Sequence, residues 1–186
     1  MVVELVGQTL GQYRVVEMIG QGGMARVYKA YQAALDRYVA IKAISAQGGD
    51  AGSDQNFLAR FTTEARLIAK LSHPNIVPVH DFGQEQGWAF IVMEYISGGT
   101  VRERLMQAEM GHTLLDLAWT LRIVEQAAQA LDFAHSKGVI HRDVKPGNML
   151  LRGNDQLLLS DFGIATMLEA SMAFSRTGTT VGTPQY

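Results

Sequence analysis

The chain has 186 residues, of which 47% are hydrophobic and 18% charged, and a formal net charge of −2. This composition indicates one folded domain or two small lobes, and the near-neutral charge gives no reason to expect nucleic-acid or membrane-surface binding. The chain has no cysteine, which excludes disulfides and thiolate metal sites and leads us to expect a cytoplasmic location.

The first part of the chain is rich in β-prone segments, and no apolar run approaches the ~18 residues of a membrane span. Strands are expected over 12–20 and 25–31, which flank a Gly-rich turn, and over 37–44. Two more are expected over 75–83 and 87–96, separated by a polar turn. These segments predict a five-stranded sheet.

A helix is predicted over roughly 54–71, between the third and fourth of these strands. Its apolar residues Phe57, Phe61, Ile68 and Leu71 recur at the spacing of one helical face. One helix packed on the sheet is therefore expected in the first half of the chain.

From residue 97 onward the pattern becomes helical. SGGT, residues 97–100, reads as a linker, and Thr100 with Glu103 forms a capping-box pattern. Asp116 is a plausible N-cap for a longer helix over 117–136, which Gly138 would end. One side of this helix is apolar, with Leu117, Leu121, Val124, Ala128 and Leu131. Short strands follow at 149–151 and 157–159, and the remainder reads as an extended surface segment.

The Gly-rich turn runs from Ile19 to Val27 and is by itself a weak signal. In a dinucleotide-binding fold such glycines lie between a strand and a helix. Here β-prone residues follow them, which favours a flap that folds over phosphates, because glycines let backbone N–H groups approach an anion. An ordinary hairpin turn is the other interpretation.

Lys42 lies in the apolar strand Val-Ala-Ile-Lys and either reaches the surface or faces an anion inside. Glu64 falls on the apolar stripe of the predicted helix, where a carboxylate is costly without a partner. An ion pair between Lys42 and Glu64 is therefore expected, with the remaining lysine donors facing a phosphate.

The segment GVIHRDVKPGNMLL, residues 138–151, places five polar side chains between apolar ends. Asp143 can orient a hydroxyl nucleophile or accept its proton, and Lys145 can neutralise a transferring phosphoryl group. His141 is expected to be a buried residue that braces the loop, and Arg142 an anchor for an anion such as a phosphorylated residue.

Asp161 follows a short apolar strand and precedes Phe162 and Gly163. An aspartate at a strand end can hold a hard cation such as Mg²⁺ through oxygen, and Asn148 would supply a second oxygen. Alone, an Asp-X-Gly turn is usually only a turn.

Taken together, these motifs resemble the signature set of protein kinases, in the order of that family. The matching residues are Gly20, Gly22, Val27, the strand Val39–Lys42, Glu64, His141 to Asp143, Asn148 and Asp161 to Gly163. The segments HPNIVPVHDFG and HRDVKPGNMLL resemble bacterial eukaryotic-like (Hanks-type) Ser/Thr kinases. Lys145, two residues after Asp143, is similar to the Ser/Thr class.

The resemblance implies an α+β, protein-kinase-like bilobal fold. Residues 1–96 would form a complete β-rich N-lobe with five strands and one helix. Residues 97–186 would form an incomplete α-rich C-lobe, because the sequence ends before the Ala-Pro-Glu motif of the family. The helix over 117–136 would then lack part of its cover and expose an apolar patch.

The resemblance also implies residue roles. The implied catalytic residues are Asp143, Lys145 and Asn148, and the implied metal ligands are Asn148 and Asp161. The implied cofactor-binding residues are Ile19, Gly20, Gly22, Gly23, Val27, Ala40, Lys42, Glu64, Met93, Glu94, Ile96 and Leu150. Among these, Met93 would be the gatekeeper of the adenine pocket, and the backbones of Glu94 and Ile96 would read the adenine edge. A stack of Val79, Ile68, Phe162 and His141 is also implied.

The implied activity is ATP- and Mg²⁺-dependent phosphoryl transfer to Ser/Thr hydroxyls of protein substrates. Thr177, Thr179 and Thr180 lie where regulatory phosphosites occur, and a kinase–kinase dimer that phosphorylates them in trans is expected. The alternative is a truncated, catalytically inactive fragment that binds a nucleotide or a partner.

Overall fold

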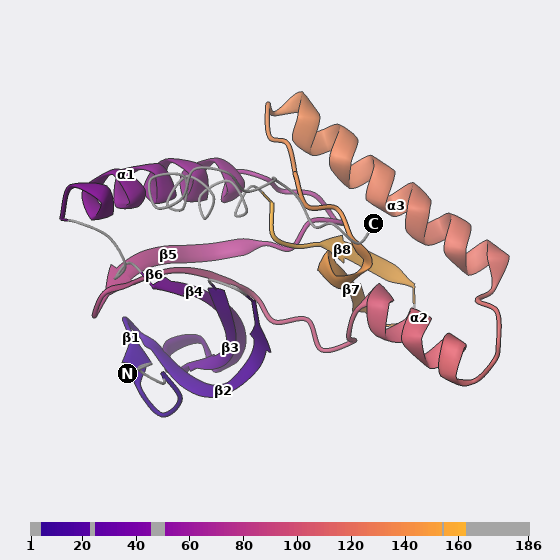
Figure 1. Ribbon diagram of the computed structural model, residues 1–186, viewed down its shortest axis with the longest axis horizontal. Coiled ribbons are helices and arrows are strands. Elements are labelled where there is room, and N and C mark those ends of the chain that lie inside the picture. Colours follow the sequence, from indigo (N-terminus) through magenta and orange to yellow (C-terminus); the bar gives the residue numbers. More distant parts are fainter. Residues whose placement is uncertain (1–4, 23–24, 46–50, 154, 163–186) are drawn as a thin grey trace.

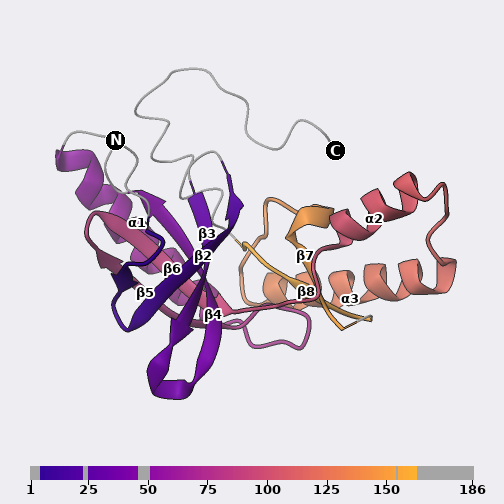
Figure 2. The ribbon, with the colours of Figure 1, turned by 90° about the horizontal axis from the view of Figure 1, so that it is seen from below.

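A curled antiparallel sheet and a helical part lie side by side in the computed structural model of the chain (Figures 1 and 2). The structure describes residues 5–22, 25–45, 51–153 and 155–162, and the side chains of the first helix only from residue 57. The sheet has the strand order β1-β2-β3-β4-β6-β5. Its strands are β1 (Thr9–Leu10), β2 (Tyr13–Gln21), β3 (Ala25–Gln32), β4 (Arg37–Ser45), β5 (Val79–Glu85) and β6 (Trp88–Glu94).

The sheet contains the five expected strands and one short addition, β1, which pairs with β2. The helices are α1 (Ala51–Ile68), α2 (Val101–Met110) and α3 (Leu117–Ser136), with short 3-10 turns η1 (Ala33–Leu35) and η2 (Pro146–Asn148). A separate hairpin pairs β7 (Met149–Arg152) with β8 (Gln156–Leu159). No helix within the described ranges is both long and apolar enough to cross a bilayer.

The two edges of the sheet approach each other, so that the sheet curls around a core of its own. The Tyr13 hydroxyl on β2 donates to Asp81 Oδ2 on β5 at 3.0 Å, and the backbone N–H of Gly11 contacts the Glu85 carboxylate. Burial, with Asp81 nearby, raises the pKa of Tyr13 and keeps this donor protonated. The enclosed residues are Leu5, Leu10, Tyr13, Val15, Tyr28, Ala30, Val39, Ile41, Ala43, Phe90 and Val92.

Tyr28 in this core carries a polar atom that has no hydrogen-bond partner in the described part of the chain. Its side chain is fully buried, and its hydroxyl has no hydrogen bond among the described residues. Replacing both partners of a hydrogen bond is nearly neutral, but leaving one buried group unpaired costs about 1–3 kcal/mol. We expect Tyr28→Phe to raise the free energy of unfolding by about 1 kcal/mol.

Urea denaturation measures this effect, with Tyr13→Phe as the matched control. Tyr13 loses a formed hydrogen bond, so its variant should be less stable by about 1 kcal/mol. Equal destabilisation by both substitutions would show that the Tyr28 hydroxyl is satisfied.

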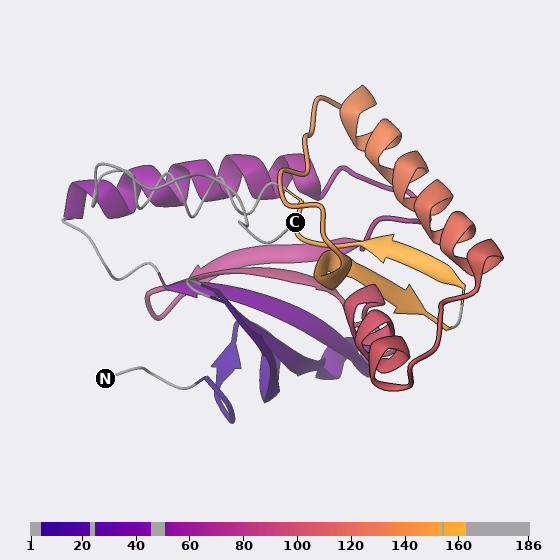
Figure 3. The same ribbon diagram turned by 45° about the vertical axis from the view of Figure 1, so that its right-hand side comes forward.

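Helix α1 covers the other face of the sheet, where it runs along the strands (Figure 3). Phe57, Phe61, Ala65 and Ile68 are buried and form one face of the helix. The helix begins and ends about three residues earlier than predicted, while Leu71 stays buried just beyond its end. The predicted apolar stripe is thus the face that packs on the sheet.

The connection from the sheet to α2 is fastened to the β7–β8 hairpin. The Leu151 N–H donates to the Gly99 carbonyl at 2.9 Å, and Thr100 forms an isolated bridge with Leu150. The capping box is present, because Glu103 N–H donates to Thr100 Oγ1 at 3.1 Å and Thr100 N–H to Glu103 Oε2 at 2.9 Å. The predicted linker is therefore an ordered junction.

Helix α3 has the expected ends but a different buried face. Its N-cap Asp116 accepts from the Trp119 N–H at 2.6 Å, and Gly138 after the helix has φ +74°. The residues that face the rest of the fold are Trp119, Ile123, Ala127, Ala130 and Ala134. Leu117, Leu121 and Val124 are 71%, 60% and 60% exposed. The expected exposed apolar patch is present on the described part of the chain.

The structure has two halves: the sheet β1–β6 with α1, and the helices α2 and α3 with the β7–β8 hairpin. Asn75, which precedes β5, joins them. Its buried side chain donates to Gln126 Oε1 on α3 and to the Leu157 carbonyl on β8, both at 2.8 Å. The Leu159 N–H in turn donates to the Asn75 carbonyl at 2.8 Å. Because the Asn75 side chain is buried, removing one partner within the assembled fold would leave a buried donor unpaired.

Candidate active site

The loop between α3 and β7 is braced by a buried histidine. His141 is 1% exposed; its Nε2 lies 2.8 Å from the Ser160 carbonyl, and its Nδ1 accepts from the Asp143 N–H at 3.3 Å. Since a carbonyl only accepts and an amide N–H only donates, the ring is neutral with its proton on Nε2. Burial lowers the pKa of His141, which agrees with this tautomer. The bracing role expected for His141 matches this geometry.

This histidine makes the stability of the fold depend on pH. Because its folded pKa lies below the unfolded value of 6.5, the unfolded chain binds the proton first as pH falls. The contribution of neutral His141 to the unfolding free energy is therefore fully present above the unfolded pKa. It decreases as the pH falls from there toward the folded pKa. We expect His141→Phe to reduce the loss of unfolding free energy between about pH 7.5 and 5.5.

Denaturant titrations at the two pH values measure this slope. Burial also lowers the pKa of His80, so that part of the slope should remain in the variant. His135→Gln, at the exposed end of α3, is the control and should keep the full slope. An unchanged slope in His141→Phe would contradict a neutral buried His141.

The three predicted catalytic residues lie together on this loop. Lys145 Nζ is 2.7 Å from Asp143 Oδ2. Asn148 Nδ2 donates to the same Oδ2 at 3.0 Å and to the Asp143 carbonyl at 2.8 Å. One carboxylate oxygen of Asp143, Oδ2, thus contacts the side chains of Lys145 and Asn148. The backbone of η2 fixes the spacing, since the Asn148 N–H donates to the Lys145 carbonyl at 2.9 Å.

Ser160 connects this loop to Asp161, and no sequence motif indicated its role. Its N–H and its hydroxyl both donate to the Asn148 carbonyl, at 2.9 and 3.1 Å, while its carbonyl accepts from His141. A serine at the end of an apolar strand carries no distinctive pattern. These bonds hold Asn148 and Asp161 in a fixed relation.

Asp161 faces Lys42 across the junction of the two halves. Lys42 Nζ lies 2.9 Å from Asp161 Oδ2, with side chains only 12% and 23% exposed. Asp161 and Arg142 both have φ +67°, a left-handed conformation that is uncommon for residues other than glycine and that clusters at functional sites.

The expected ion pair between Lys42 and Glu64 is wrong for this structure. Among the described residues, no cation lies within ion-pair distance of Glu64, and the partner of Lys42 is Asp161. The centre of the buried face of α1 is Ala65, so Glu64 lies at its border and is only partly buried. Water can still reach the Glu64 carboxylate there, so its partial burial does not require an ion-pair partner.

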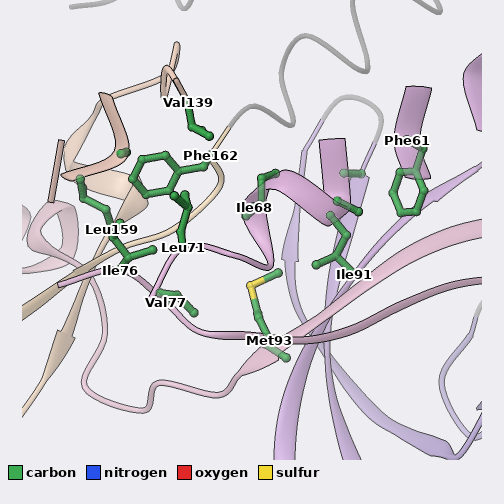
Figure 4. Packing of buried hydrophobic residues seen from close by; sticks show 14 of the residues in the cluster. Phe61, Ile68, Leu71, Ile76, Val77, Ile91, Met93, Val139, Leu159 and Phe162 are labelled. Atoms are coloured by element: carbon green, nitrogen blue, oxygen red, sulfur yellow. The ribbon is translucent and has the colours of Figure 1, made fainter. Parts of the chain in front are cut away.

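Apolar side chains pack directly behind Asp161. The rings of His141 and Phe162 lie 4.5 Å apart, and Phe162 lines a small pocket with Ile68 and Val79. Of the four residues of the implied stack, His141 and Phe162 are in ring contact, and Ile68, Val79 and Phe162 surround one pocket. Met93 lines the same pocket, and Figure 4 shows its side chain near Ile68.

The residues expected around the adenine share one hydrophobic cluster. Ala40 pairs with Met93 across β4 and β6, and both are buried. Val27, Ile96 and Leu150 are partly buried against the same cluster. Residues that the resemblance assigns to the adenine pocket thus come from both halves and belong to or pack against one cluster.

The Gly-rich turn is a β-hairpin between β2 and β3, which agrees both with a flap and with an ordinary hairpin turn. Gly20 pairs with Val27, and the Gly22 N–H donates to the Ala25 carbonyl at 2.9 Å. Ile19 before it is 45% exposed. Gly23 lies outside the described residues, as do the phosphosite candidates Thr177, Thr179 and Thr180.

The oxygen donors of the site suit a nucleotide-bound Mg²⁺, which proteins usually hold with one or two carboxylates plus phosphate oxygens. Asp161 supplies a carboxylate that already attracts the Lys42 cation. Asn148 uses its amide nitrogen on Asp143, which leaves its amide oxygen as a ligand. The described residues contain no cluster of three or more His, Cys, Asp or Glu that could hold a metal.

A curled sheet with a Gly-rich hairpin, joined to a helical half with lysine, aspartate and asparagine at the junction, defines the protein kinase class. The sequence family described as "Protein kinase domain" matches residues 13–186, so the chain belongs to the protein kinase family. Its curated relatives include bacterial Ser/Thr protein kinases.

Two of these relatives are about equally similar to the chain. A probable serine/threonine-protein kinase of Streptomyces coelicolor is 41% identical over 95% of this chain. Serine/threonine-protein kinase PknA of Mycobacterium tuberculosis is 40% identical over 97% of it. The chain spans only 26% and 42% of the lengths of these two proteins.

A solved structure agrees with the fold. The crystal structure of the kinase domain of Mycobacterium tuberculosis PknI matches with a TM-score of 0.71 and 37% identity. The match covers 86% of this chain and 62% of that one. The α+β kinase fold is confirmed.

Proposed function

We propose that this chain transfers the γ-phosphoryl group of ATP to Ser/Thr hydroxyls of proteins, with Mg²⁺ as the metal. The observation that carries the proposal is the single bonded assembly of Asp143, Lys145, Asn148, Asp161 and Lys42 at the junction of the two halves. Phosphoryl transfer depends mainly on positioning and electrostatic stabilisation, and this assembly supplies both.

Asp143 is proposed to orient the substrate hydroxyl through its carboxylate and to take its proton. The hydroxyl oxygen forms a bond to the γ-phosphorus while the bond from that phosphorus to the β-phosphate oxygen breaks, and ADP leaves with the bonding electrons. Lys145, whose Nζ lies 2.7 Å from Asp143, is proposed to neutralise charge on the transferring group.

Lys42 is proposed to exchange its present partner for the α- and β-phosphates when ATP binds. Its ammonium is largely withdrawn from water, so a phosphate oxygen can replace the Asp161 oxygen at little desolvation cost. Asp161 and Asn148 would then hold Mg²⁺, which supplies positive charge to the phosphates.

The experiment measures ATP binding and transfer separately on the same preparation. Calorimetry with ATP, in Mg²⁺ or in EDTA, gives binding, and radiolabelled ATP with a general basic protein substrate gives transfer. The proposal predicts Mg²⁺-dependent binding together with label on the substrate. Binding without transfer at any enzyme concentration would contradict it.

The second candidate is a non-catalytic module that binds a nucleotide or a protein partner. The exposed Leu117, Leu121 and Val124 on α3 favour it, because contiguous apolar surface often marks an interaction site. The same experiment separates the candidates, since this module would bind ATP or a partner and leave the substrate unlabelled.

A further inference from the structure

Two cations hold the segment that leads out of β6, residues Glu94 to Ile96. Arg152 at the end of β7 donates from Nη2 to Glu94 Oε1 at 2.5 Å. This contact ties the segment to the helical half of the molecule. The Glu94 N–H also donates to the carbonyl of Pro78, the residue before β5, at 3.0 Å. This bond fixes the backbone of Glu94.

Lys29 on β3 holds the same segment from the side of the sheet. Its Nζ lies 5.0 Å from the ring centroid of Tyr95 and 4.6 Å from that of Tyr38. Glu17 Oε1 on β2 lies 3.2 Å from the same nitrogen. One ammonium group thus links three neighbouring strands and the residue between Glu94 and Ile96.

The surroundings suit a permanent cation at this position. The Lys29 side chain is only 22% exposed, and two aromatic faces take the place of water around its charge. The hydrogen bond to Glu17 raises the pKa of Lys29, so the ammonium stays charged. Lys29 also pairs in register with Ala40, which in turn pairs with Met93 at the expected adenine pocket.

We propose that Lys29 is a positioning residue for the nucleotide, which holds Tyr95 in the Glu94–Ile96 segment from the side of the sheet and sets the affinity for the adenosine part of ATP. The inference rests on the proposed ATP binding. A segment already held in its binding conformation loses little conformational entropy when the ligand binds. If Tyr95 is released, ordering the segment costs entropy on binding, and the affinity falls.

The test compares the affinity of variants for MgATP and for inorganic tripolyphosphate, which has no adenosine. We expect Lys29→Met to weaken ATP binding about fivefold, the size expected for a partly desolvated cation–π contact. Tripolyphosphate affinity should not change, because Lys42 and the Gly-rich turn are untouched. Lys29→Arg keeps a cation over both rings and should restore ATP affinity.

Two further variants complete the design. Tyr95→Leu removes the ring and leaves the pair of Lys29 with Glu17 intact, so it should also weaken ATP binding selectively. Lys70→Met is the matched control, because Lys70 is exposed and has no ion pair among the described residues.

Each outcome has one meaning. A wild-type chain that binds no ATP contradicts the proposed function itself. Wild-type binding with equal affinity in Lys29→Met and Tyr95→Leu overturns the positioning role. Equal weakening for ATP and tripolyphosphate, or no rescue by arginine, also overturns it, because a general structural defect would act in that way.

Discussion

Asp143→Asn should reduce phosphoryl transfer by about 10²- to 10⁴-fold, the range for loss of a positioned acid–base group. The substitution keeps the shape of the side chain but removes the charge that pairs with Lys145 at 2.7 Å. It also leaves a neutral amide where the hydroxyl proton would go. Affinity for MgATP should stay the same, because Asp143 is not among the residues expected to touch the nucleotide.

Initial rates with labelled ATP and a saturating protein substrate measure this effect. Asp132→Asn is the matched control, since Asp132 is exposed on α3 and lacks an ion pair among the described residues. It should transfer phosphate at the wild-type rate. An Asp143→Asn variant as fast as the control would remove Asp143 from the mechanism.

Gly98→Ala should strongly destabilise the chain, because the connection between the two halves has no room for a side chain. A Cβ at residue 98 would lie 2.0 Å from the Leu151 carbonyl oxygen, and this atom belongs to the backbone of β7. Relief would require moving β7 away and breaking the bond from Leu151 N–H to the Gly99 carbonyl. We expect a loss of about 3 kcal/mol in unfolding free energy.

Thermal and urea denaturation measure this loss. Gly147→Ala is the control, because a Cβ there meets nothing closer than the Arg102 side chain at 3.9 Å. Its unfolding free energy should change by less than about 1 kcal/mol. Wild-type stability in Gly98→Ala would mean that the connection is not packed against β7.

The start of α2 and both ends of α3 were predictable from the sequence because local chemistry determines them, whereas α1 is shifted by about three residues from its predicted range. The capping box of Thr100 with Glu103 and the Asp116 cap need only neighbouring residues, and both are present. The order of the site motifs was also sufficient to indicate the kinase fold, because each motif lies in a strand, helix or loop of the expected type.

The buried face of α3 was not predictable, because that helix is apolar on two sides. The stripe through Leu117, Leu121 and Val124 is more hydrophobic, yet the face that packs contains Trp119 and small alanines. Small residues allow close approach to β8 but give a weak periodic signal. The choice between the two faces depends on what the rest of the fold presents.

The partner of Lys42 was likewise beyond the sequence. Glu64 and Asp161 are both carboxylates in suitable motifs, and the choice between them depends on the distance between a helix and a distant strand end. Ser160, Lys29 and Arg152 carry no motif and act through contacts with residues far away in the sequence. Only the assembled fold brings these groups together.

The most direct test of the central claim is the identity of the amino acid that receives phosphate from ATP. A substrate protein is incubated with the chain and labelled ATP, in Mg²⁺ or in excess EDTA, and then hydrolysed to its amino acids. We expect phosphoserine and phosphothreonine in Mg²⁺ and neither in EDTA. Label on tyrosine, or no label above that given by Asp143→Asn, would contradict a Ser/Thr kinase site built on Lys42, Asp143, Asn148 and Asp161.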